Sequence, residues 1–157
     1  MRPAIPSSTG TPRDDRRAFR VAVAVWALVI LAATSLPAPG VSTALPHWAD
    51  KVVHFTLYCV LGFLAARAFL NPPPVREKAI GGAHDWKRIH IGWLALLLLA
   101  IFAGADEFHQ HWIRGRSPSP GDWIADVLGA GFGIAIGTYM HRSNRKSEPG
   151  FDRETDC

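Results

Sequence analysis

The chain has 157 residues, which is the length of a single domain. Apolar residues make up 48% of it and charged residues 19%, and the mean hydropathy of +0.09 hides the fact that the apolar residues come in blocks. Its two cysteines, Cys59 and Cys157, are too few for a disulfide framework. The net charge of +4 comes without a nucleic-acid-binding motif, so we expect no nucleic-acid partner.

Four apolar segments follow a polar N-terminal arm, and we expect each segment to cross a membrane. The arm, residues 1–20, is rich in Pro, Ser, Thr and Arg and is expected to be disordered. Residues 21–140 are predicted to form one all-α bundle of four transmembrane helices, followed by a disordered tail over residues 141–157. A cleaved twin-arginine signal is the alternative for the first segment, and retention is favoured because the helix count is then even. The expected spans lie at residues 21–36, 52–70, 89–105 and 122–140.

The basic residues are distributed unequally between the two ends of these segments. Of the 17 Lys and Arg residues, 14 fall in the N-terminal arm, in the stretch 67–88 or in the tail. Because positive charge is retained on the cytoplasmic side, both termini are expected to be cytoplasmic. The protein is therefore predicted to be a multi-pass protein of a bacterial inner membrane, with the other two loops on the outer face.

Polar side chains crowd at the outer ends of the segments, where a bilayer makes them costly. Asp50, His54 and Tyr58 are spaced four residues apart and share one helical face, as do Asp106 with Gln110. We predict that three segment ends meet and form one site. The predicted ligand-binding residues are Asp50, Lys51, His54, Tyr58, Asp106, Glu107, Gln110, Arg116, Ser117, Asp122 and Asp126.

Most of these residues fall into three motifs: Asp50-Lys51-x-x-His54-Phe55-x-x-Tyr58-x-x-Leu61-Gly62, Asp106-Glu107-x-x-Gln110 and Gly115-Arg116-Ser117-x-Ser119-x-x-Asp122. Asp126 follows in Asp122-x-x-x-Asp126-x-x-Gly129. With these motifs the chain resembles the VanZ-like family of small bacterial membrane proteins. The resemblance covers about residues 21–140 and implies a four-helix membrane fold. It also implies a role of the kind associated with the founding member, which is resistance to the glycopeptide antibiotic teicoplanin. Asp126 departs from the pattern, because the family usually has Asn there.

Each of these residues also has a purely structural interpretation. Asp106, Glu107, Arg116 and Asp122 could form a buried ion-pair network that locks the helices together. Tyr58 is expected to be a core or interfacial aromatic, and His54 either hydrogen-bonds within the bundle or carries protons. Ser117 is expected to be a turn or cap residue, and His109 and His111 to be exposed. Small residues at 125, 129, 133 and 137 are expected to pack against another helix.

Three classes of function remain open at the level of the sequence. The favoured one is a binding protein in which Arg116 and Lys51 hold a phosphate or carboxylate of a lipid-linked cell-wall precursor or a lipoglycopeptide. The second is a membrane enzyme with Asp106 or Glu107 as base, His54 as proton shuttle and Arg116 as stabiliser. The third is a proton-linked transporter or an envelope scaffold, either of which could be a homo-oligomer.

Metal and cofactor motifs are missing from the sequence. There is neither a Cys-x-x-Cys nor a His-Glu-x-x-His pattern, so we predict no cofactor and no metal. A divalent metal held by the carboxylates and His54 stays open only as a variant of the enzyme hypothesis. Membrane lipids are the one partner class that every hypothesis shares.

Overall fold

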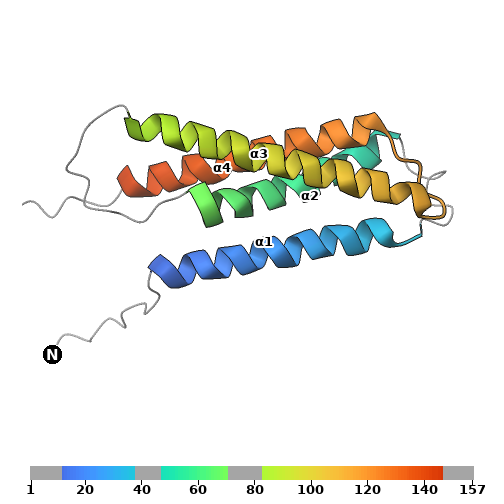
Figure 1. The fold of residues 1–157 in the computed structure, drawn as a ribbon, viewed down its shortest axis with the longest axis horizontal. Coiled ribbons are helices and arrows are strands. Elements are labelled where there is room, and N and C mark those ends of the chain that lie inside the picture. The colour runs from blue at the N-terminus through green and yellow to red at the C-terminus, as the bar shows by residue number, and fades with distance from the viewer. Residues whose placement is uncertain (1–11, 38–46, 71–82, 147–157) are drawn as a thin grey trace, which may run out of the picture.

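A computed structural model shows four long helices that run alternately up and down (Figure 1). They are α1 (Pro12–Ser35), α2 (His47–Ala65), α3 (Ala83–His109) and α4 (Pro120–Lys146). A π-helical turn, η2 (Ala66–Leu70), continues α2, and a 3₁₀ turn, η3 (Gln110–Trp112), continues α3. The structure describes residues 12–37, 47–70 and 83–146. Within these ranges the chain is all-α, as predicted.

The helices carry their large apolar side chains on the outside. Each helix, taken with the short π or 3₁₀ turn that continues α2 and α3, provides a stretch of 22 to 24 residues that is long and apolar enough to cross a membrane. Leu28 on α1 and Leu98 and Ile101 on α3 are among the large apolar residues exposed on the bundle surface. Soluble monomers rarely expose apolar surface on this scale, whereas a bilayer solvates it. The chain is therefore a multi-pass membrane protein.

The helices extend beyond the spans expected from hydropathy. Helix α1 begins at Pro12, so residues 12–20 of the expected disordered arm are helical. Proline is favoured in the first helical turn, and Asp14 and Asp15 follow it where acidic groups complement the helix dipole. Helix α3 likewise begins at Ala83 inside the expected loop, and α4 continues to Lys146. The rest of the predicted arm, loop and tail lies outside the described residues.

Glycines make the closest helix–helix contact, between α2 and α4. A Cβ atom on Gly129 would collide with the carbonyl oxygen of Phe55, and one on Gly133 with that of Cys59. On the opposite side of the contact, a Cβ on Gly62 would collide with the backbone of Ala130. The predicted packing role of the small-residue stripe is thus confirmed within one chain.

The core lies where all four helices converge. Its fully buried apolar residues are Ile30, Tyr58, Leu61, Ala103 and Ala130. Two tryptophan indole groups form hydrogen bonds between helices beside this core. The Trp26 Nε1 donates to the carbonyl oxygen of Leu57 at 2.9 Å, and the Trp123 Nε1 donates to that of Ala100 at 3.0 Å. These bonds hold α1 to α2 and α4 to α3.

Candidate functional site

Buried polar residues gather at one end of the bundle. The C-terminal ends of α1 and α3 and the N-terminal ends of α2 and α4 all lie at this end (Figure 1). The predicted meeting of three segment ends is therefore confirmed, and the end of α1 joins them. We call the buried polar residues the polar cluster: Thr34, His54, Asp106, Glu107, Gln110, Asp122 and Asp126.

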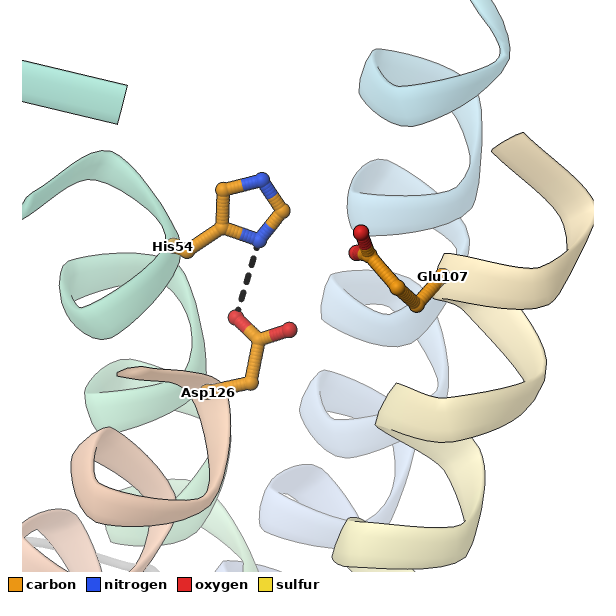
Figure 2. A group of neighbouring side chains, drawn as sticks. All are labelled: His54, Glu107 and Asp126. Carbon is orange, nitrogen blue, oxygen red and sulfur yellow. Dashed lines mark hydrogen bonds and ion pairs between the residues drawn. The ribbon is translucent and has the colours of Figure 1, made fainter. Parts of the chain in front are cut away.

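A histidine and two carboxylates lie close together in the cluster (Figure 2). His54 projects from α2, Glu107 from α3 and Asp126 from α4, and one ligand atom from each lies within 4.8 Å of the others. The Nδ1 atom of His54 is 3.0 Å from the Oδ1 atom of Asp126, and both side chains are almost fully buried. The α2–α4 glycine contact sets this distance, because Phe55 follows His54 directly and Gly129 lies one turn beyond Asp126.

Asp106 is bonded to helix α1 through a residue that the sequence analysis did not select. The hydroxyl of Thr34 donates a 2.7 Å hydrogen bond to the Oδ1 atom of Asp106, and both residues are buried. The same hydroxyl lies 3.0 Å from the carbonyl oxygen of Ile30. A lone threonine in an otherwise apolar run was the available signal, but its partner is 72 residues away in sequence.

Ser119 caps helix α4 and connects it to Glu107. Its Oγ atom accepts a 3.3 Å bond from the backbone N–H of Asp122 and donates a 2.6 Å bond to the Oδ2 atom of that residue. Pro120 occupies the first helical position, where a missing N–H costs nothing. The backbone N–H of Ser119 donates to the Oε1 atom of Glu107 at 2.5 Å. Ser117, which was expected to be a turn or cap residue, is exposed in the loop before α4, and the cap of that helix is Ser119.

Lysine rather than arginine provides the ion pair of the cluster. The Nζ atom of Lys51 lies 2.7 Å from the Oδ1 atom of Asp122. The Nη2 atom of Arg116 donates to the carbonyl oxygen of Ala33 at 3.0 Å, and among the described residues Arg116 has no ion pair. The alternative of an ion-pair network around Arg116 is therefore not borne out among the described residues. Gly115, at a φ of 80°, turns the chain so that the arginine reaches the end of α1.

Several buried polar atoms of this region lack a hydrogen-bond partner within the described part of the chain. Asp106 and Asp126 each use one carboxylate oxygen and leave the other unpaired. Tyr58 is a core aromatic, as predicted, with its ring 6.1 Å from that of Phe102. Its hydroxyl has no partner within the described ranges. The unpaired atoms are Tyr58 Oη, Asp106 Oδ2, Arg116 Nε and Asp126 Oδ2.

The remaining predicted residues lie at the edge of the cluster. Gln110 is buried, and its amide lies 3.4 Å from the Oε2 atom of Glu107. Asp50 is exposed. His109 and His111 are exposed as expected, and the Nε2 atom of His109 is 3.2 Å from the Oγ atom of Ser35.

The composition of the cluster limits what it can bind. Four carboxyl groups, those of Asp106, Glu107, Asp122 and Asp126, lie near one another, and one of them is paired with Lys51. Unpaired carboxylate oxygens accept hydrogen bonds from hydroxyl and amine groups or coordinate cations. The site therefore suits a polar, hydroxyl-bearing group or a cation better than a bare anion.

The family of the chain follows from a comparison with known proteins. The family model described as VanZ/LLP1 matches residues 11–141, which include all four membrane-spanning stretches and every residue of the polar cluster. No curated protein and no solved structure matches the chain.

Proposed function

The chain belongs to the VanZ/LLP1 family, and from that premise we propose that it acts at the bacterial cell envelope by binding the polar headgroup of an amphiphilic molecule. The headgroup would enter the polar cluster while the apolar part of the molecule stays in the bilayer. Lipid-linked cell-wall precursors and lipoglycopeptides have this chemistry. Binding of either kind would account for a resistance role of the teicoplanin type.

The observation that carries this proposal is the set of buried polar atoms without partners. Leaving such an atom unpaired costs about 1–3 kcal/mol, so a fold that keeps several together favours a ligand that pairs them. The hydroxyls of a sugar or peptide headgroup could donate to Asp106 and Asp126. The Nε–H of Arg116 and the hydroxyl of Tyr58 could donate to an anionic or carbonyl oxygen.

The proposed orientation places this end of the bundle on the outer face of the inner membrane. The distribution of Lys and Arg supports it, because most of them lie toward the opposite end of the helices. Envelope precursors and antibiotics would then both have access to the cluster, and both termini would be cytoplasmic.

The test is mass spectrometry of the lipids that purify with the protein from bacterial membranes. The wild type is compared with Arg116→Ala and with the matched variant Arg114→Ala, whose arginine is exposed in the same turn. We expect one headgroup class to be enriched with the wild type and Arg114→Ala and lost from Arg116→Ala. The same lipid profile in all three proteins, with circular dichroism showing all three folded, would overturn the proposal.

An enzyme acting on such a lipid is the second candidate, and one observation favours it. The ring of His54 is hydrogen-bonded to Asp126, and the carboxylate of Glu107 lies beside the pair. A histidine oriented by a carboxylate is the usual arrangement of a proton-transferring group. Turnover of the co-purified lipid that Glu107→Gln abolishes would support the enzyme, and a lipid recovered intact after incubation would count against it.

A further inference from the structure

We infer that His54, Glu107 and Asp126 form a binding site for one divalent metal ion of the zinc type. The inference concerns the same cluster, but the metal can bind whether or not a headgroup does. Three observations carry it: the convergence of three ligand atoms from three helices, the unpaired oxygen of Asp126, and the chemistry of the donor set.

The geometry is close to that of a metal site. Zinc bonds to nitrogen and oxygen ligands are about 2.0–2.2 Å long, so neighbouring ligand atoms in a tetrahedral site lie roughly 3.3 Å apart. The His54 and Asp126 atoms are already 3.0 Å apart, and all three ligand atoms lie within 4.8 Å of one another. The Glu107 carboxylate would have to move toward the other two ligand atoms to close the remaining gap.

The unpaired oxygen of Asp126 points to a ligand that the protein itself does not provide. The side chain of Asp126 is 1% exposed, and its Oδ2 atom has no hydrogen-bond partner within the described ranges. Figure 2 shows this oxygen directed from α4 toward Glu107, into the space between the three side chains. A buried carboxylate with a free oxygen is stabilised when a cation binds it.

The donor set selects the class of metal. Imidazole nitrogen with two carboxylates suits zinc and similar transition metals, whereas magnesium and calcium prefer oxygen ligands alone. One of the proposed ligands is also oriented by a second-sphere contact, because the Oε1 atom of Glu107 accepts a hydrogen bond from the backbone N–H of Ser119. Binding of the metal would displace the proton that His54 and Asp126 share.

Three protein ligands leave a tetrahedral metal with one open position. An anionic oxygen of the headgroup, from a phosphate or a carboxylate, could occupy it, and only in this respect does the inference rest on the proposed function. A metal would explain how a cluster with four carboxyl groups accepts an anionic ligand.

The experiment is isothermal titration of Zn²⁺ into purified, chelator-stripped full-length protein in detergent, without added lipid. We expect one site per chain in the wild type, with at least about 100-fold weaker binding in Asp126→Asn and His54→Asn. The controls Asp15→Asn and His111→Asn change exposed residues of the same types and should bind as the wild type does. No binding by the wild type, or equal binding by all five proteins, would overturn the inference.

A second measurement uses only the wild type, so its result does not depend on whether the variants fold. X-ray absorption at the zinc edge should show nitrogen and oxygen ligands with one imidazole, and two or more imidazoles or a sulfur ligand would overturn the assignment. The outcome is separable from that of the proposed function. Metal binding without lipid enrichment would refute only the proposed headgroup site. Lipid enrichment without metal binding would refute only the metal site.

Discussion

A methyl group added to Gly129 should weaken the whole bundle and disturb the site at the same time. Gly129→Ala places a Cβ on the carbonyl oxygen of Phe55, a contact that requires α2 and α4 to move apart. Overpacking of this kind costs about 1–3 kcal/mol. The replacement of glycine by alanine within a helix also contributes about 1 kcal/mol in the opposite direction, which must be removed from the comparison.

Gly131→Ala provides that correction, because it lies two residues away in the same helix. A Cβ there would meet the Leu96 Cδ1 atom at 3.8 Å, which is an ordinary contact. Both variants gain the same helix propensity. The difference between their free energies of unfolding should therefore equal the overpacking cost, about 1–3 kcal/mol with Gly129→Ala the less stable.

The assay is equilibrium unfolding of both variants in mixed detergent, followed by circular dichroism. A zinc titration adds a readout of the site, because the separation of α2 from α4 carries His54 away from Asp126. Zinc affinity should fall in Gly129→Ala and stay unchanged in Gly131→Ala. Equal stabilities of the two variants would show that α2 and α4 do not pack through this glycine, and that the glycine contact does not set the distance between His54 and Asp126.

Two further substitutions test the links that hold the cluster in place. Thr34→Val removes the hydrogen-bond donor to Asp106 and should lower the free energy of unfolding by about 1–3 kcal/mol. Thr34→Ser keeps the hydroxyl and should retain most of the wild-type stability. An equal loss of stability in both variants would assign the effect to packing alone. Ser119→Ala removes the cap of α4 and should cost about 0.5–2 kcal/mol in thermal or denaturant unfolding, whereas Ser117→Ala, at an exposed position, should cost almost nothing. Equal effects of the two serine substitutions would contradict the assignment of the cap.

The architecture could be predicted from the sequence because a bilayer imposes it. Every backbone group in the hydrocarbon must be paired, so an apolar block of sufficient length has to be helical, and four such blocks joined in series alternate in direction. The meeting of Asp106 and Asp122 follows from this alternation. The glycine spacing likewise predicts a close helix contact, although the sequence leaves open whether the partner is α2 or a second chain.

The side-chain partners within the cluster could not be predicted in the same way. An ion pair between Arg116 and an acidic residue was one structural interpretation of the sequence, but the turn at Gly115 directs its guanidinium to the carbonyl of Ala33. Lys51 instead forms the ion pair, with Asp122, which lies 71 positions away in the sequence. Such choices depend on helix rotation and loop conformation, which periodicity does not fix to the few tenths of an ångström that a hydrogen bond requires.

Asp126 decides how the charge of the cluster is balanced. An asparagine at this position could still accept a hydrogen bond from the ring of His54 through its amide oxygen, so Asp126→Asn should preserve the fold. It would remove one negative charge and one of the two anionic metal ligands. A carboxylate here leaves the cluster with more acidic groups than Lys51 can pair, and the excess is balanced by protons on His54 or on the carboxyl groups themselves, or by a bound metal. If Asp126→Asn loses zinc but keeps the co-purified lipid, headgroup binding does not require the metal. If it loses both, the metal is the group that holds the anionic oxygen.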